Sequence, residues 1–288
     1  MVYGNVTDFK IISGGGFIVD LNFKDIIYEK KDGVAKIKIN RPEKLNACTN
    51  YSLQEIALAI QDAGWDKKIG VVVITGAGPK AFCTGGDTGT RSKEGYAVMD
   101  EGLGFGEISL LDIHSHILHL IRTIPKPVIA AVNGYAVGGG HVLHVVCDIS
   151  IASETAKFGQ VGPKVGSFDA GIGTVYLAHV VGEKKAREIW YMCRLYTAQE
   201  ALEMGLVNKV VPADKLEEEV ATWCKELLEK SPTSLAVLKY SFNTDTDCYN
   251  THMMGMRACD LYFGTDEAME GRNAFMENRK PDFNKFRK

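Results

Sequence analysis

Apolar residues near the start of the chain first follow strand-like patterns and then change to helical spacing. The runs DIIYEKK and VAKIKIN are predicted strands, and Asp32-Gly33 between them predicts the turn of a hairpin. Between residues 50 and 65, apolar residues recur at the spacing of a helix. The β-branched run VVVIT at 71–75 has no polar interruption, so it predicts a strand in a sheet covered on both faces.

The middle of the chain repeats the order helix, strand, helix, strand. ISLLDIHSHILHLIRT is predicted to be helical, PVIAAVNGYAV to be one buried strand, HVLHVVCD a helix and ISIAS a strand. This order predicts an α/β fold with crossover connections. Residues 88–107 are polar and glycine-rich without a sustained period, which favours a mobile loop over a site rather than a plain surface excursion.

After about residue 180 the pattern becomes mainly helical. Thr197 and Glu200 resemble a capping box at the start of a helix, and Gly205 resembles a helix stop. Helices gathered at one end of a chain often pack on a partner subunit, so this part is a candidate for subunit contact. Residues 1–22 are expected to form an extension, with a glycine triplet as a flexible joint.

Bulk properties indicate an ordinary globular protein. The 288 residues are 45% hydrophobic and 24% charged, with a net charge of −3. No basic tract indicates a nucleic-acid partner, and no run of about 18 apolar residues indicates a membrane span. The start of the chain lacks a signal-peptide pattern, and the seven cysteines form no CxxC motif. We therefore expect a cytoplasmic protein with reduced thiols, and neither a zinc site nor a disulfide framework.

Two glycine-rich turns are the first candidate chemistry. They are Thr84-Gly85-Gly86-Asp87 and Gly138-Gly139-Gly140-His141; each follows a predicted strand, and the second opens a predicted helix. Glycine lets backbone N–H groups approach a ligand, and a helix N-terminus adds positive potential. Two converging amides of this kind would hold an oxygen that gains negative charge. Neither turn has the spacing of a phosphate-binding loop, and taken alone each is better explained as a tight turn in a packed α/β protein.

Four motifs in order extend this picture: NRPEKLNA (40–47), AFCTGGD (81–87), IPKPVIAAVNGYAVGGG (124–140) and CDISIAS (147–153). Together they resemble the crotonase, or enoyl-CoA hydratase, superfamily from about residue 23 to the C-terminus. The resemblance implies an α/β fold, a crotonase-type spiral of ββα units with a C-terminal helical trimerisation region. The expected parts are an N-terminal extension at 1–22, a spiral core at 23–200 and a helical region at 201–288.

The resemblance also implies the ligand and the assembly. The substrate would be a small-molecule acyl-CoA, with coenzyme A as part of the substrate and no permanently bound cofactor. The amides of Gly86 and Gly139 would bind the thioester oxygen. The expected assembly is a homotrimer or homohexamer, without nucleic acid or membrane.

The two glutamates of the family's hydratases are missing. One belongs two residues after the glycine triplet, where this chain has Val142, and the other belongs in an FGQPE segment, where this chain has Gly162. Water addition needs positioned carboxyl groups as general acid and base, which valine and glycine do not supply. Ordinary hydratase activity is therefore not expected.

The segment FGQVGPKVGSFDAG (158–171) resembles two subgroups of the superfamily. They are dihydroxynaphthoyl-CoA synthase, which closes a ring, and 2-ketocyclohexanecarboxyl-CoA hydrolase, which opens one. The resemblance implies that Ser167 and Asp169 lie at the reacting carbon; from the residues alone, a pair that caps a helix near Ala170 would be favoured. Both reactions pass through a thioester enolate, so the same pair of amides would serve either.

Local details favour the ring-opening hydrolase. Val161 stands where the synthase usually has threonine, and CTGGD, AREIWYMC and SFNTDT look hydrolase-like, whereas GGGHVLH looks synthase-like. Phe263 stands where both subgroups tend to have tyrosine, Asn278 where a lysine is expected, and Leu45 where the synthase has arginine. The prediction is hydrolytic C–C ring cleavage of a cyclic β-oxoacyl-CoA. The alternatives are the ring-closing synthase and a non-catalytic acyl-CoA-binding scaffold.

The resemblance gives the expected site residues. The catalytic set is Gly86, Gly139, Asp169, Ser167 and Tyr96, the last as a replacement for a loop tyrosine of both subgroups. The substrate-binding and CoA-binding set is Lys44, Leu45, Ala47, Ala81, Thr84, Gly85, Asp87, Thr88, Tyr135, Val137, Gly138, Val161, Gly162, Phe263 and Lys280.

Several other residues with reactive or charged side chains favour plain structural roles or remain secondary candidates. Lys239 and Arg279 are further candidates for the coenzyme A phosphates, but Lys44 is favoured because the NRPEKLNA segment lies along the cofactor in the family. The spacing of His114, His116 and His119 is poor for a metal site, and no metal is expected. His141, His144 and Cys83 are interpreted as core or surface residues rather than as ligands or a nucleophile.

Overall fold

The computed structural model describes residues 10–12, 16–18, 23–92, 95–96, 110–168, 172–244, 258–259 and 261–286. Its largest sheet has six strands in the order β14 (Lys209–Val211), β11 (Ile149–Ser153), β9 (Val128–Val132), β5 (Val71–Gly76), β4 (Val34–Ile39) and β3 (Ile26–Lys31). All neighbours in this sheet are parallel except β3 and β4. Those two form the predicted hairpin, in which Asp32 and Gly33 both adopt positive φ.

A second sheet has four strands in the order β13 (Leu195–Thr197), β12 (Lys157–Gly159), β10 (Tyr135–Val137) and β6 (Ala81–Cys83). The chain passes from the large sheet to this one after β5, after β9 and after β11. With each passage, one parallel strand is added to each of the two sheets. The chain therefore forms a spiral of repeating units. Two short hairpins complete the described strands, β1 (Lys10–Ile12) with β2 (Gly16–Ile18), and β7 (Arg91–Ser92) with β8 (Gly95–Tyr96).

The segment PVIAAVNGYAV is two strands, and the prediction of one was wrong. β9 belongs to the six-stranded sheet and β10 to the four-stranded one. Asn133 makes the break, because its amide donates to the carbonyls of Gly76 and Gly78 at 3.0 and 2.6 Å. A Cβ on Gly134 would lie 2.1 Å from the carbonyl oxygen of Lys80, so only glycine fits where the chain changes sheet.

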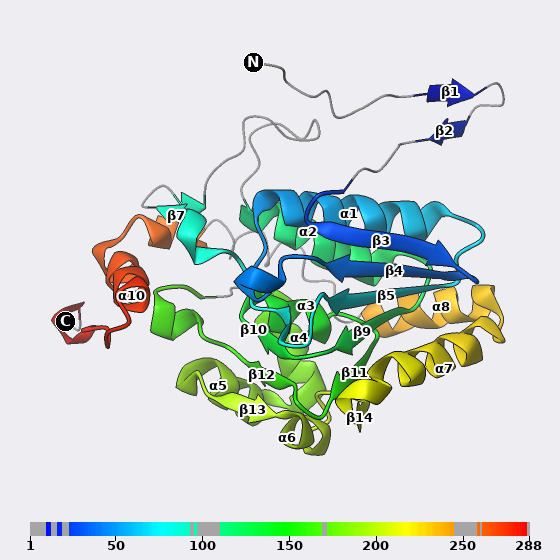
Figure 1. Ribbon diagram of the computed structural model, residues 1–288. Helices are drawn as coiled ribbons and strands as arrows, with labels where there is room; N and C mark the ends of the chain where they lie inside the picture. The colour runs from blue at the N-terminus through cyan, green and yellow to red at the C-terminus, as the bar shows by residue number, and fades with distance from the viewer. Residues whose placement is uncertain are drawn as a thin grey trace.

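The α-helices with defined bounds are α1 (Asn50–Trp65), α2 (Leu110–Thr123), α3 (Gly139–Val145), α4 (Ile172–Val181), α5 (Glu183–Met192), α6 (Ala198–Glu203), α7 (Leu216–Leu228), α8 (Pro232–Asn243) and α10 (Asp266–Met276). Residues 258–259 and 261–263 are helical as well. Helices α1 and α2 lie on one side of the large sheet and α7 on the other (Figure 1). Alternate residues of β5 accordingly enter different apolar clusters, Val72 on the α1–α2 side and Val71 on the α7 side. The prediction that β5 is covered on both faces is confirmed.

Caps define several of the helices. Thr49 and Ser52 form a capping box at the start of α1, and the predicted capping box of Thr197 and Glu200 is confirmed at α6. Gly205 has a φ of +74° just after α6, as expected for a helix stop. The part after residue 180 is mainly helical as predicted, but it also contributes β13 and β14 to the two sheets.

Helix α8 is held by an ion pair between the buried Lys239 and the exposed Asp148. Lys239 is 6% exposed, and its Nζ donates to Asp148 Oδ2 at 2.7 Å and to the carbonyl of Lys126 at 2.8 Å. Asp148 Oδ2 also accepts from the amide of Val128 at 2.7 Å, which ties α8 to the start of β9. Lys239 therefore serves the fold, and its candidacy for the coenzyme A phosphates was wrong. None of the helices within the described ranges is long and apolar enough to cross a membrane.

Candidate active site

A cavity of about 130 Å³ lies where the two glycine turns meet. Nine of the residues expected at the site line its wall: Thr84, Gly85, Gly86, Thr88, Gly138, Gly139, Val161, Gly162 and Ser167. The other lining residues are Cys48, Leu53, Ile56, Cys83, Leu111, His114, Ile117, Val142, Leu143, Gln160, Val165, Phe168 and Trp190. The wall is thus built from both turns, from α1 and α2, and from the segment around Ser167.

The two glycine turns touch each other directly. Gly85 has a φ of +87°, and a Cβ on it would lie 2.9 Å from the amide nitrogen of Gly139. On the other side, a Cβ on Gly140 would lie 2.0 Å from the carbonyl oxygen of Cys83. Glycine is therefore required at both positions for the turns to approach this closely.

Two amides at this contact are available to a ligand. Cys48 pairs with the first turn by donating to the carbonyl of Gly85 at 2.7 Å and accepting from the amide of Asp87 at 2.9 Å. In this pairing the amide of Gly86 makes no hydrogen bond, and no other described residue accepts from it. The amide of Gly139 is in the first turn of α3, where helical N–H groups have no partner within the helix. An anionic oxygen placed between them would receive two hydrogen bonds.

Gln160 and His141 lie next to the second turn. Gln160 Nε2 is 3.4 Å from the carbonyl oxygen of Gly138 and 3.2 Å from His141 Nδ1. His141 is fully buried, and desolvation lowers its pKa to about 3, so its imidazole is neutral. His144 is also fully buried, with its Nδ1 3.2 Å from Ser150 Oγ. The interpretation of both histidines as core residues is confirmed.

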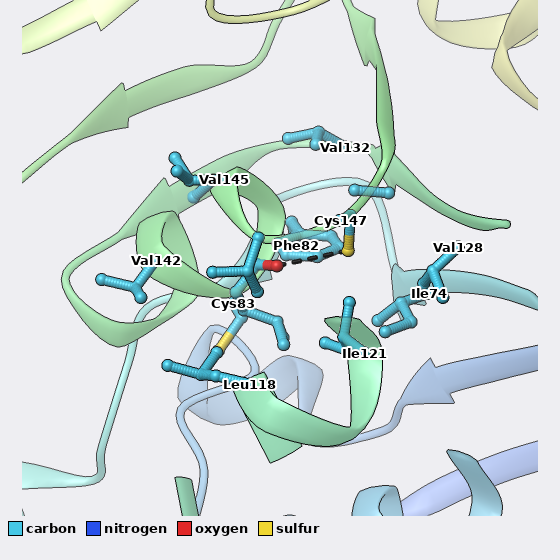
Figure 2. Close-up of a cluster of buried hydrophobic side chains, with 14 of the residues drawn as sticks. Ile74, Phe82, Cys83, Leu118, Ile121, Val128, Val132, Val142, Val145 and Cys147 are labelled. Carbon is cyan, nitrogen blue, oxygen red and sulfur yellow. Dashed lines mark hydrogen bonds between the residues drawn. The ribbon is translucent and has the colours of Figure 1, made fainter. Parts of the chain in front are cut away.

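The thiols of Cys48 and Cys83 lie next to the first turn. Cys48 Sγ and Cys83 Sγ are 3.7 Å apart, each side chain is 2% exposed, and the amide of Gly85 donates to Cys83 Sγ at 3.4 Å. The neighbouring thiol and burial hold the pKa of Cys48 above its ordinary value. The interpretation of Cys83 as a small core thiol is confirmed, because it packs among apolar side chains such as Leu118 (Figure 2).

The two positions of the hydratase glutamates are apolar or closed. Val142 is 2% exposed and belongs to the apolar cluster that includes Cys83 (Figure 2). A Cβ on Gly162 would lie 2.9 Å from the carbonyl oxygen of Ser167, so a side chain does not fit there without movement of the backbone. Within the part of the wall that the structure describes, no Asp, Glu, Lys or Arg is present.

Ser167 is half-buried on the cavity wall, just after the short helix η3 (Gly162–Val165). Its amide donates to the carbonyl of Gly162 at 2.8 Å, which folds this segment back on itself. Helix α10 packs behind η3 so closely that a Cβ on Gly271 would lie 2.3 Å from the amide nitrogen of Gly166. Asp169 lies outside the described residues, as does the side chain of Tyr96, whose backbone forms β8.

The remaining expected site residues do not line the cavity: Lys44, Leu45, Ala47, Ala81, Asp87, Tyr135, Val137, Phe263 and Lys280. Lys44, Leu45, Tyr135 and Lys280 are exposed, whereas Ala81, Val137 and Phe263 are buried. Asp87 is held by Arg41, whose Nη2 is 3.2 Å from its Oδ2, and it accepts from the amide of Gly89 at 3.1 Å. Thr84 Oγ1 donates to the carbonyl of Leu45 at 3.1 Å, which joins the NRPEKLNA segment to the first turn.

Sequence reasoning missed the helical part of the wall. Leu53 from α1, Leu111, His114 and Ile117 from α2, and Trp190 from α5 all contribute. Helical periodicity predicts that such positions face inward, but it does not distinguish a core from a cavity. The one available signal was His114, a polar residue in the same helical register as Ile117 and Ile121.

Residues 29–286 match the family model for enoyl-CoA hydratase/isomerase. The chain belongs to the crotonase, or enoyl-CoA hydratase/isomerase, family. An enoyl-CoA hydratase from Mycobacterium avium subsp. paratuberculosis K-10 is 28% identical with a TM-score of 0.77, covering 91% of this chain and 99% of that one. An enoyl-CoA hydratase subunit I from Geobacillus kaustophilus HTA426 is 30% identical with a TM-score of 0.68, covering 91% and 98%.

A methylmalonyl-CoA decarboxylase in complex with 2-nitronate-propionyl-CoA is also similar to this crotonase-family chain. It is 25% identical with a TM-score of 0.77, covering 91% of this chain and 98% of that one. The predicted fold class, an α/β crotonase-type spiral with C-terminal helices, is confirmed. The family processes acyl-CoA thioesters, and the similar structures include both hydratases and a decarboxylase.

Proposed function

We propose that this crotonase-family protein opens the ring of a cyclic β-oxoacyl-CoA by hydrolysing a carbon–carbon bond. One observation carries the proposal. The contact between Gly85 and Gly139 leaves two amides at one cavity, while Val142 and Gly162 occupy the positions of the hydratase glutamates. The site can therefore stabilise a thioester enolate, but it lacks the carboxylates that add water to an alkene.

The reaction runs through that enolate. Water adds to the ring ketone, and Asp169, oriented by Ser167, accepts the proton that water releases. The bond between the former ketone carbon and the α-carbon then breaks, and its electron pair forms the thioester enolate. The amides of Gly86 and Gly139 hold the enolate oxygen, the α-carbon takes up a proton, and the product is a ring-opened acyl-CoA with a new carboxylate.

The character of the wall supports this chemistry. Leu53, Ile117 and Trp190 line the cavity, so a carbocyclic ring would meet apolar side chains. Hydrogen bonds to a developing charge are stronger in such a low-dielectric site, where one donor contributes about 10²–10³-fold to the rate. Lys44 and Lys280 are exposed and are proposed to meet the coenzyme A phosphates at the protein surface.

The ring-closing synthase is the second candidate, because it needs the same enolate site and because GGGHVLH resembles that subgroup. A paired assay distinguishes the two. The protein is incubated with 2-ketocyclohexanecarboxyl-CoA and, separately, with succinylbenzoyl-CoA, and the products are identified by mass spectrometry. Ring opening of the first ester supports the proposal, and closure of the second supports the synthase. Binding of the esters without conversion of either would favour a non-catalytic acyl-CoA-binding scaffold.

The role of Asp169 is tested by Asp169→Asn. We expect turnover to fall by about 10²–10⁴-fold, because a general base is lost, while the dissociation constant of the acyl-CoA changes less than about threefold. Asp214→Asn is the matched control, since Asp214 is exposed in the short helix η4 (Ala213–Lys215). Unchanged turnover in the Asp169 variant would remove Asp169 from the mechanism.

The assembly expected from the family resemblance is a homotrimer or homohexamer, and we keep it as a proposal. Helix α8 exposes Val237, Leu238 and Phe242, which are 60%, 53% and 79% exposed in the single chain. Exposed apolar side chains grouped on one helix are typical of surfaces that pack against another subunit. Sedimentation velocity measures the assembly, and a monomer at micromolar concentration would contradict the proposal.

A further inference from the structure

His114 is the residue of the cavity wall whose chemistry the reaction above leaves unused. It lies in the first two turns of α2, is half-buried, and lines the cavity. Its Nε2 lies 3.4 Å, and its Cε1 3.8 Å, from the point that a Cβ on Gly139 would occupy. The edge of the imidazole therefore faces the residue whose amide binds the enolate oxygen.

The distance allows proton transfer to a bound thioester. A Cβ lies about 2.5 Å from the amide nitrogen of its own residue, given standard bond lengths and angles. His114 Nε2 is therefore within about 6 Å of the Gly139 amide. A thioester oxygen on that amide has its α-carbon two bonds away. The imidazole reaches such a carbon directly or through one water, which is the range of general acid–base catalysis.

The wall offers few other groups that change protonation near neutral pH. Its described polar side chains are Thr84, Thr88, Gln160 and Ser167, and none of these titrates there. The thiols of Cys48 and Cys83 are 2% exposed and point at each other. Histidine is the side chain whose ordinary pKa suits proton exchange with a carbon acid at this pH.

The periodicity of helix α2 places His114 on the face that lines the cavity and His116 on the exposed face. His114, Ile117 and Ile121 are three and four residues apart, so they share one face, and Ile117 also lines the cavity. His116 lies on the exposed face of the same helix. Two histidines of one helix thus provide a test residue and a matched control.

We infer that His114 is a catalytic residue that exchanges a proton with the α-carbon of the bound thioester. In the forward reaction the imidazolium donates its proton to the enolate carbon as the new C–H bond forms, and the imidazole becomes neutral. The proton that Asp169 took from water returns to His114 through solvent, which restores both residues. The new carboxylic acid releases its own proton to solvent as it becomes the carboxylate. This inference depends on the proposed function only for the origin of the enolate.

The test measures α-proton exchange, which needs no ring cleavage. Cyclohexanecarboxyl-CoA has an α-proton but no ring ketone, so the protein can ionise it but cannot open it. The ester is incubated with the protein in D₂O, and deuterium at the α-carbon is followed by mass spectrometry. We expect His114→Gln to lower the exchange rate by about 10²–10⁴-fold and His116→Gln to leave it within twofold.

Further measurements separate catalysis from structure. In the wild type the exchange rate should rise with pH through the titration of one group and then level off, because only neutral imidazole removes the proton; this dependence should vanish in His114→Gln. Added imidazole should restore exchange to His114→Ala, whose side chain leaves a gap beside Gly139. Calorimetry checks that the ester still binds with a dissociation constant within about threefold of the wild type.

The outcomes distinguish the role of His114 from the proposed function. Unchanged exchange in His114→Gln, or no exchange in the wild type, overturns the inference. Exchange that depends on His114 without ring opening of any cyclic β-oxoacyl-CoA supports the inference and contradicts the proposed function. Ring opening with exchange that is indifferent to His114 supports the function and removes His114 from it.

Discussion

The contact between the two glycine turns makes a sharp prediction for Gly85→Ala. The new Cβ would lie 2.9 Å from the amide nitrogen of Gly139, and the atom it meets belongs to the backbone. A backbone atom cannot rotate aside as a side chain does, so the turns must separate. Separation moves the amides of Gly86 and Gly139 apart, and one oxygen can no longer accept from both.

The magnitude has two parts. A φ of +87° costs a residue with a side chain about 1–2 kcal/mol, which lowers the free energy of unfolding. Loss of one donor to a developing oxyanion costs about 10²–10³-fold in rate, or about 2.7–4 kcal/mol. We therefore expect Gly85→Ala to fold with reduced stability and to lose most of its catalytic rate.

Gly182→Ala is the matched control. Gly182 has a φ of +78° at the start of α5, and no atom lies within 4 Å of the position of its Cβ. It has a positive φ as Gly85 does, but without the contact, so we expect a loss of stability of about 1–3 kcal/mol and unchanged turnover.

The assay is the affinity for an acyl-CoA nitronate, a mimic of the enolate, measured beside the affinity for coenzyme A alone. Gly85→Ala should weaken nitronate binding by about 10²–10³-fold and change coenzyme A binding little. Unfolding in urea supplies the stability of both variants. If Gly85→Ala binds the nitronate within twofold of Gly182→Ala, the two amides do not act together on one oxygen, and the reasoning is refuted.

Two further predictions concern buried charge. The pKa of His141 is lowered to about 3 in the folded state and that of His144 is also lowered, against about 6.5 when unfolded, so below pH 6.5 the unfolded chain binds more protons. For His141 the free energy of unfolding should therefore fall by about 1.4 kcal/mol per pH unit as the pH drops from 6 to 4, and His144 should add a contribution of the same sign. His141→Asn should remove the first of these contributions; an unchanged pH dependence of the unfolding free energy, measured in urea, would contradict this. Lys239→Met removes the buried ammonium group from its ion pair with the exposed Asp148 and should lower the free energy of unfolding by about 1.5–3 kcal/mol at unchanged turnover; a loss below about 0.5 kcal/mol in urea would show that the pair matters little.

Local patterns predicted most of the elements correctly. The β3–β4 hairpin, the bounds of α1 and the capping box of α6 agree with the structure because each depends on residues close together in the chain. The break between β9 and β10 was missed for the opposite reason. Asn133 ends β9 by bonding to carbonyls near Gly76, and nothing within PVIAAVNGYAV reveals those distant partners.

The candidate site was likewise predictable from the sequence only in part. The sequence determined which chemistry is absent, because a valine at 142 and a glycine at 162 have no carboxyl group in any fold. It also indicated the two turns, since only glycine allows backbone to approach backbone that closely.

Only the tertiary structure decided what those turns and their neighbours form. The contact of Gly85 with Gly139, the apolar lining from α1 and α2, and the approach of His114 to Gly139 all join residues distant in the chain. Their distances depend on how the two sheets and the helices pack, and periodicity along one helix carries no information about the element it faces. The sequence thus determined the loss of the hydratase carboxylates and the residues able to form turns, and packing decided that these turns create a cavity with a histidine on its wall.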